Sequence, residues 1–140
     1  MFLLDTNVVL ELRKVRAGKA DHNVPEWSAN VRSEDLYLSV ITLQELEIGV
    51  LLVERRDSKQ GTLLRAWFDK QVLPAFAGRI FDIDSAVTLR SAKLHVPHPR
   101  PVRDGLIAAT ALVHRMILVT RNVADFEPTG VPTLNPWSVS

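Results

Sequence analysis

Four acidic residues stand at comparable places in the chain, close to the end of a predicted strand or the start of a predicted helix. They are Asp5, Glu45, Asp104 and Asp125. Four carboxylates brought together repel one another unless protons or cations intervene. Because this set offers hard oxygen ligands without histidine or cysteine, it favours Mg²⁺ or Mn²⁺. Such a site suits phosphodiester hydrolysis, since a bound metal lowers the pKa of water and offsets charge on the phosphoryl oxygens.

Each acid taken alone also has a purely structural explanation, because helix N-termini favour negative charge. Asp5 follows the apolar run Phe2-Leu3-Leu4 and can cap the next helix. Glu45 can complete a capping box that begins at Thr42. Glu47 competes with Glu45 for the site, but the two point nearly opposite ways on a helix. The predicted cap at Thr42 selects Glu45, and the recurrence of four such acids indicates a shared site.

Strands and helices alternate along the whole chain, which predicts an α/β fold with a small, mainly parallel sheet flanked by helices. We expect strands at 2–4, 36–40, 79–82, 117–120 and 131–134, and helices at 6–16, 25–32, 42–55, 58–73, 85–94 and 101–116, with a turn or short helix at 121–126. Ligands bind at the carboxyl ends of parallel strands. The four acids are therefore expected to converge at that edge, with polar support from Asn7, Thr120 and Asn122.

Composition limits the remaining possibilities. At 140 residues, with 46% apolar and 24% charged side chains, the chain is expected to form a single domain over residues 1–140. The absence of cysteine argues against disulfides and thiolate chemistry. The acid at position 5 argues against a signal peptide, and the apolar run from Ile48 to Val53 is too short to cross a membrane. These features predict a cytoplasmic protein without a membrane partner.

The predicted helix at 42–55 is apolar on nearly every side. Its apolar residues are Leu43, Leu46, Ile48, Val50, Leu51, Leu52 and Val53. A helix with this pattern is expected to be buried all round. In so small a domain we expect a second subunit to cover part of it, which predicts a homodimer.

Four segments, in chain order, resemble the motifs of PIN-domain ribonucleases. They are Leu4-Asp5-Thr6-Asn7-Val8, Glu45-Leu46-Glu47-Ile48-Gly49, the segment from Arg103-Asp104-Gly105 to Ala111, and the segment from Thr120-Arg121-Asn122 to Asp125-Phe126. The resemblance spans essentially the whole chain and is closest to the toxins of VapBC-type toxin–antitoxin pairs, FitB-like members included. It implies a PIN-like fold and a Mg²⁺- or Mn²⁺-dependent endoribonuclease toxin, commonly dimeric, that acts on structured RNA such as tRNA or rRNA. It also implies a cognate antitoxin that obstructs the site.

The resemblance assigns roles to individual residues. Asp5, Glu45, Asp104 and Asp125 become the catalytic and metal-binding quartet, with Asp5 and Asp104 as the principal metal ligands and Glu45 and Asp125 binding through water or a second ion. Thr6, Asn7, Thr120 and Asn122 match the family's supporting polar positions. Arg100, Arg103 and Arg121 lie beside these motifs and are candidate RNA contacts, although solvent-facing arginine is the commoner case.

Two other functions are compatible with acids at strand ends. A receiver-like signalling domain also binds Mg²⁺ at such an edge, but it requires a lysine after a late strand. Here Thr120-Arg121-Asn122 offers none. A catalytically silent PIN-fold binding protein would keep the fold without the reaction, and a nuclease assay separates it from an enzyme.

Overall fold

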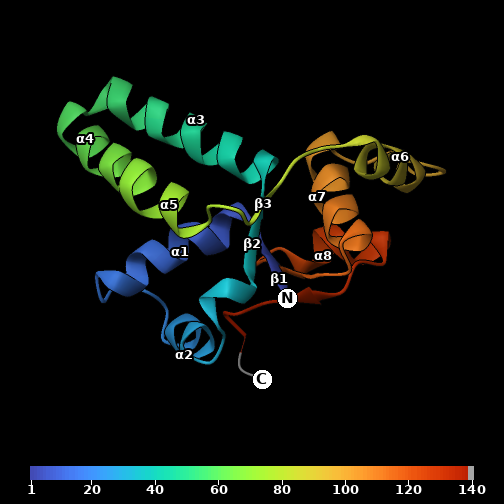
Figure 1. Ribbon diagram of the computed structural model, residues 1–140, viewed down its shortest axis with the longest axis horizontal. Coiled ribbons are helices and arrows are strands. Elements are labelled where there is room, and N and C mark those ends of the chain that lie inside the picture. The colour runs from blue at the N-terminus through green and yellow to red at the C-terminus, as the bar shows by residue number, and fades with distance from the viewer. Residues whose placement is uncertain (139–140) are drawn as a thin grey trace.

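Five short strands form the centre of the molecule, in the order β3-β2-β1-β4-β5 (Figure 1). The structure is a computed structural model and describes residues 1–138. The strands are β1 (Phe2–Leu4), β2 (Leu36–Ser39), β3 (Ile80–Phe81), β4 (Ile117–Val119) and β5 (Thr133–Leu134). Every neighbouring pair is parallel. The predicted α/β class and all five predicted strand positions are confirmed.

The strand order reverses at the centre of the sheet. From β1 the chain moves outward to β2 and β3, then crosses to β4 on the other side of β1 and ends at β5. In parallel sheets, a crevice opens outside the carboxyl ends of the two strands that flank such a reversal. Asp5 directly follows β1 and Thr120 directly follows β4, so both lie at this crevice.

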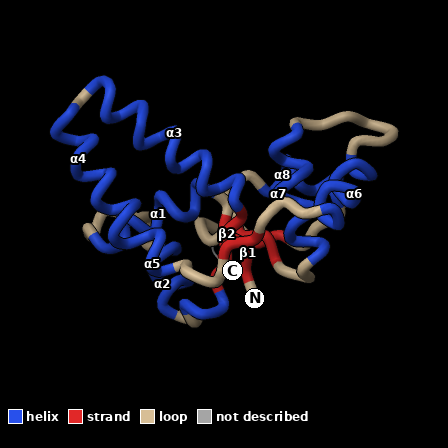
Figure 2. Tube along the Cα trace, turned by 45° about the horizontal axis from the view of Figure 1, so that its top comes forward, coloured by secondary structure: helices blue, strands red, loops and turns tan. Residues whose placement is uncertain are grey.

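Helices cover both faces of the sheet (Figures 1 and 2). On one face lie α1 (Thr6–Arg16), α2 (Asn23–Ala29), α3 (Val40–Arg56), α4 (Ser58–Trp67) and α5 (Leu73–Ala75). On the other lie α6 (Ser85–Leu94), α7 (Val102–Val113) and α8 (Val123–Phe126). Alternation along the strands supplies both cores, since Leu4 and Val119 pack on the first face while Leu3 and Leu118 pack on the second.

The helix after β2 begins earlier than predicted. Helix α3 starts at Val40, and Ser39 is its N-cap, with Oγ accepting from the Ile41 N–H at 3.0 Å. The predicted start and capping box at Thr42 are therefore wrong. Thr42 is fully buried, and its hydroxyl has no hydrogen-bond partner in the described part of the chain. Glu45 consequently lies in the second turn of α3 rather than the first, so capping does not explain it.

Two further helix boundaries differ from the predictions. Helix α2 begins at Asn23, ahead of Pro25, and ends at Ala29 rather than Arg32. The helix predicted to end before Pro74 continues from α4 through a π-helical turn (Phe68–Val72) into α5. Pro74 lies in α5, directly after the π-helical turn.

The prediction that helix α3 is buried on all sides is wrong for the single chain. Leu46 and Val50 are buried, but Ile48, Leu51 and Leu52 are about half exposed, at 48%, 53% and 58%. These three residues follow the i, i+3, i+4 spacing of one helix face. Among residues 1–138, no helix is long and apolar enough to span a membrane.

Candidate active site

Asp5 is the most deeply placed acid of the candidate site. It caps α1 by accepting from the Thr6 N–H through Oδ1 at 2.9 Å, and it is only 1% exposed. Its other oxygen, Oδ2, accepts from the buried Thr120 hydroxyl at 2.8 Å. The backbone N–H of Asp5 also donates to the Val119 carbonyl at 2.9 Å, which ties β1 to β4. These contacts fix the carboxylate at the crevice between the two strands.

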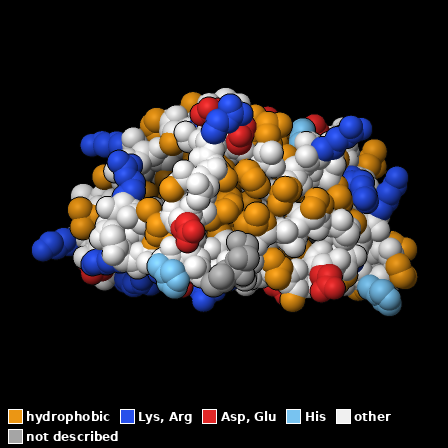
Figure 3. All heavy atoms as spheres, turned by 90° about the horizontal axis from the view of Figure 1, so that it is seen from below, with side chains coloured by type: hydrophobic (Ala, Val, Ile, Leu, Met, Phe, Trp, Pro, Cys, Tyr) orange, Lys and Arg blue, Asp and Glu red, His pale blue; other side chains and the backbone are white. Residues whose placement is uncertain are grey.

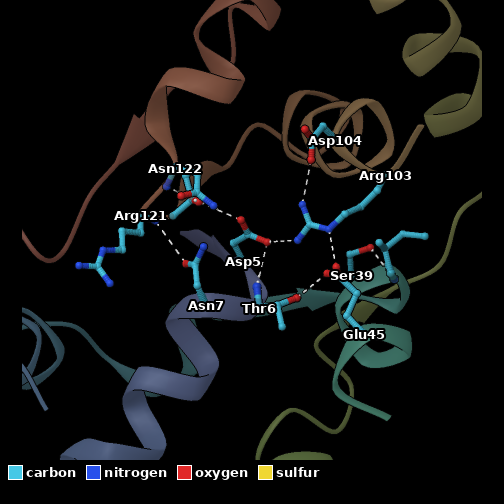
Figure 4. A network of polar contacts seen from close by, with 11 residues as sticks. Asp5, Thr6, Asn7, Ser39, Glu45, Arg103, Asp104, Arg121 and Asn122 are labelled. Atoms are coloured by element: carbon cyan, nitrogen blue, oxygen red, sulfur yellow. Dashed lines mark hydrogen bonds and ion pairs between the residues drawn. The ribbon is translucent and has the colours of Figure 1, made fainter. Parts of the chain in front are cut away.

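The guanidinium of Arg103 lies at the centre of three carboxylates (Figure 4). Its Nε donates to Oε2 of Glu45 at 2.6 Å, and its Nη1 donates to Oδ1 of Asp104 at 2.9 Å. Its Nη2 forms an ion pair with Oδ1 of Asp5. The structure therefore brings three of the four predicted acids together, from the end of β1, from α3 and from α7, with one arginine between them.

These contacts shift the ionisation of the groups involved. Burial alone raises the pKa of Glu45, but hydrogen bonds from Arg103 and Thr6, together with the guanidinium charge, outweigh burial and lower the pKa. The Thr6 hydroxyl donates to Oε1 of Glu45 at 2.6 Å. Burial alone would lower the pKa of Arg103. The hydrogen bond to Glu45 and the charge of Asp5 outweigh burial, so the pKa of Arg103 is raised. These contacts thus favour the carboxylate form of Glu45 and the cationic form of Arg103.

Asp125 lies outside this network. It sits on α8 with an exposed side chain, and within residues 1–138 no hydrogen bond or ion pair joins that side chain to the other three acids. Its backbone N–H donates to the Asn122 carbonyl at 3.1 Å, which closes the turn after β4. The structure therefore joins three of the four predicted acids through Arg103, and the role of Asp125 stays a prediction.

The predicted supporting residues connect the start of α1 to the segment after β4. The Asn7 side-chain oxygen accepts from the Arg121 N–H at 3.2 Å. The Thr120 hydroxyl, besides donating to Asp5, accepts from the Asn122 N–H at 3.1 Å. These bonds hold the start of α1 against the segment after β4, so the polar residues position the backbone of the site.

The three predicted arginines lie in different surroundings. Arg103 points into the acidic cluster, as described above. The Arg121 guanidinium is 5.1 Å from the ring centroid of Trp137, within cation–π range. Arg100 Nε donates to the Leu94 carbonyl at 2.5 Å and so ties the loop to the end of α6. On the face shown in Figure 3, basic side chains are scattered along the rim and form no continuous area.

Sequence reasoning missed the central place of Arg103 and the cap at Ser39. The position of Arg103, next to Asp104 in the first turn of α7, was visible in the chain. The direction of the Arg103 side chain could not be predicted from the sequence, because a side chain in the first turn can face either the crevice or solvent. Ser39 was detectable in principle, since serine directly before an apolar helical run is a favoured N-cap.

The donor set fits a divalent cation in chemistry. Asp5, Glu45 and Asp104 offer only carboxylate oxygens, which suit Mg²⁺ and Mn²⁺. All three already surround one positive group, as they would surround an ion. However, across residues 1–138 no three acidic or histidine side chains lie close enough together to hold a metal. The guanidinium of Arg103 lies between the three carboxylates.

Comparison with known proteins identifies the family. The sequence model of the PIN domain matches residues 2–127. The chain belongs to the PIN-domain family. The predicted resemblance and the predicted PIN-like fold are therefore confirmed, and a receiver-like domain has no support.

Several relatives of this PIN domain are similar over nearly their whole length. VapC ribonuclease Y4jK of Sinorhizobium fredii is 36% identical over 142 residues, covering 98% of each chain. Toxin FitB of Neisseria gonorrhoeae is 35% identical, covering 98% of this chain and 99% of FitB. The crystal structure of FitAcB from the same organism matches with a TM-score of 0.89 at 35% identity, covering 99% of this chain and 100% of that one.

Proposed function

We propose that this PIN domain is a metal-dependent endoribonuclease, the toxin of a type II toxin–antitoxin pair. Relatives named as a VapC ribonuclease and as the toxin FitB, each at least 35% identical over 98% of the chain, support this function. The observation that carries the proposal is the convergence of Asp5, Glu45 and Asp104 at the carboxyl end of β1. In a ribonuclease family, such a cluster of acids is suited to phosphodiester hydrolysis.

Ribonucleases of this family depend on metal ions, and we propose Mg²⁺ or Mn²⁺ as the ion here. Asp5, Glu45 and Asp104 would hold it, with the exposed Asp125 contributing through water or at a second ion. A bound ion would generate hydroxide from water near neutral pH and offset charge on the scissile phosphate. Asp5 is held for this role by Thr120 and the Thr6 N–H, while the Thr6 hydroxyl orients Glu45.

The substrate and the protein partner are part of the same proposal. We expect the substrate to be structured RNA, tRNA or rRNA, with Arg100 and Arg121 available for phosphate contacts. We also expect a cognate antitoxin, because the similar FitB is named as a toxin and a FitAB assembly has been solved bound to a DNA fragment, with a TM-score of 0.89 to this chain. Residues 1–140 would act as one cytoplasmic domain.

A homodimer follows from the apolar face of α3. Ile48, Leu51 and Leu52 present adjacent half-exposed side chains, and burying such side chains is favourable by about 1.5–3 kcal/mol each when burial is complete. Light scattering of the purified chain should give twice the monomer mass of 15.7 kDa. Leu51→Lys should shift it to the monomer, whereas Leu89→Lys, at an exposed leucine on α6, should not.

The nuclease proposal is tested by incubating the purified chain with total RNA and Mn²⁺ or Mg²⁺. Cleavage should stop with a chelator, and it should be lost in Asp5→Asn and Asp104→Asn variants that still fold. Glu34→Gln is the matched control, because Glu34 is an exposed acid just before β2, at the opposite edge of the sheet from the cluster. Unchanged cleavage in both Asp5→Asn and Asp104→Asn would refute the assigned roles. An absence of cleavage under every condition would instead favour the silent binding protein.

A further inference from the structure

Arg103 contacts all three converging acids with separate nitrogen atoms. Nε pairs with Glu45, Nη1 with Asp104 and Nη2 with Asp5, so each edge of the guanidinium is used (Figure 4). The acids come from three segments of the chain, and one of them lies 98 positions away from the arginine. A single cationic group therefore provides the charge that holds the cluster together.

The cluster needs a positive charge in this position. Three carboxylates at one crevice would repel one another strongly if left alone, particularly because Asp5 is only 1% exposed. Arg103 offsets part of this charge, but its planar fork keeps the carboxylates too far apart to act as ligands for one ion. No three acids in the described chain meet that requirement. The arginine and a metal ion thus compete for the same oxygens.

We propose that Arg103 is an internal counter-ion that occupies the place of the metal, and that a divalent cation binds by displacing its guanidinium. This inference rests on the proposed function, since it concerns the same acidic site. It makes Arg103 a regulatory group of the site, in addition to any contact with RNA. Metal binding then includes the cost of breaking three charged contacts, which lowers the affinity of the site for the ion.

The arginine is the part of the cluster that can move. Its side chain is 32% exposed and is attached to the first turn of α7, at the mouth of the crevice. Asp5, by contrast, is buried and fixed by Thr120 and the Thr6 N–H. Glu45 keeps its bond from Thr6 when the guanidinium leaves. Asp5 is therefore held in place without the arginine, and the arginine can exchange with solvent without disturbing the core.

The inference is tested by measuring Mn²⁺ binding in the absence of RNA, by electron paramagnetic resonance of the free ion or by calorimetry. Arg103→Met removes the counter-ion and keeps the bulk of the side chain. We expect it to bind Mn²⁺ roughly tenfold tighter or more, because a positive charge has left the immediate surroundings of the ion. Arg121→Met is the matched control. It removes the same charge from an exposed arginine outside the cluster and should change the affinity by less than about threefold.

Thermal unfolding gives a second readout. Without metal, Arg103→Met should melt below the wild type, because the carboxylates lose their counter-ion. Saturating Mn²⁺ should raise its melting temperature by more than it raises that of the wild type. If Arg103→Met does not fold, Arg103→Lys serves instead. It keeps the charge but loses the three-way fork, and it should bind Mn²⁺ more tightly than the wild type.

The outcomes separate this inference from the proposed function. If the wild type binds Mn²⁺ and cleaves RNA, but neither Arg103 variant binds the ion more tightly, the counter-ion inference is wrong and the nuclease proposal stands. If Arg121→Met tightens Mn²⁺ binding as much as Arg103→Met does, the effect comes only from the lower positive charge of the whole protein, and the inference is again wrong. If no variant binds Mn²⁺ and the wild type does not cleave RNA, the proposed function itself fails.

Discussion

Replacing Thr120 by valine removes a hydroxyl that donates to Oδ2 of Asp5. Thr120 is fully buried, and its hydroxyl donates to Oδ2 of Asp5 at 2.8 Å. Valine has nearly the same shape, so the packing around β4 is preserved. What is lost is a hydrogen bond to a buried, charged carboxylate. The same hydroxyl accepts from the Asn122 N–H, but Asn122 is exposed and water can take over that bond.

The expected loss of stability follows from that single contact. Hydrogen bonds to charged groups contribute about 1.5–3 kcal/mol, and Asp5 is too deeply buried for water to replace the donor. We therefore expect Thr120→Val to lower the free energy of unfolding by about 1.5–3 kcal/mol. Thr133→Val, at a half-buried strand threonine, is the control and should change it by less than about 0.5 kcal/mol.

Urea unfolding of a double-mutant cycle tests the reasoning. In an Asp5→Asn background the charge is gone, so Thr120→Val should cost less than it does in the wild type. We expect a coupling of about 1–2 kcal/mol between the two positions, with unchanged m-values. If the two effects simply add, the Thr120 hydroxyl does not support the Asp5 carboxylate, and the proposed positioning of the site is wrong.

Three further predictions concern other parts of the structure. A methyl group at Gly61 would lie 2.5 Å from the Glu54 Cα, so Gly61→Ala should destabilise the α3–α4 pair by about 1–3 kcal/mol in urea unfolding. A Cβ added at Gly49 has no neighbouring atom within 4 Å, so Gly49→Ala should instead stabilise the protein by up to about 1 kcal/mol. Equal effects of Gly61→Ala and Gly49→Ala on stability would contradict the close packing of Gly61 against Glu54. Because the pKa of Glu45 is lowered on folding, its contribution is complete above about pH 5 and is lost as the pH falls through the lowered pKa. Metal-free wild type should therefore lose more stability between about pH 5 and pH 3 than Glu45→Gln does, and parallel pH profiles would refute this. Asp125→Asn should weaken Mn²⁺ binding less than Asp5→Asn or Asp104→Asn does, as measured by calorimetry. An equal loss of affinity would place Asp125 within the cluster.

The sequence alone determined the local structure well. A short apolar run ended by Asp5 predicted both β1 and the cap of α1, where Oδ1 of Asp5 accepts from the Thr6 N–H at 2.9 Å. Residue types also determined the kind of chemistry, because carboxylates without thiols or paired histidines favour hard cations. These properties depend on neighbours within a few residues, which are visible in the chain itself.

Only the tertiary structure decided how the acids are arranged. Whether Glu45 lies in the first or second turn of α3 depended on which hydroxyl caps the helix, and Ser39 took that place while Thr42 went into the core. Whether Asp125 joins the others depended on the path of the chain after β4. Whether Arg103 meets solvent or acids depended on the crossing that brings α7 beside β1, 98 positions away. The sequence shows the spacing of apolar residues along each helix or strand and the residues that cap each helix. The distances between these elements are set by how their apolar faces pack on the sheet.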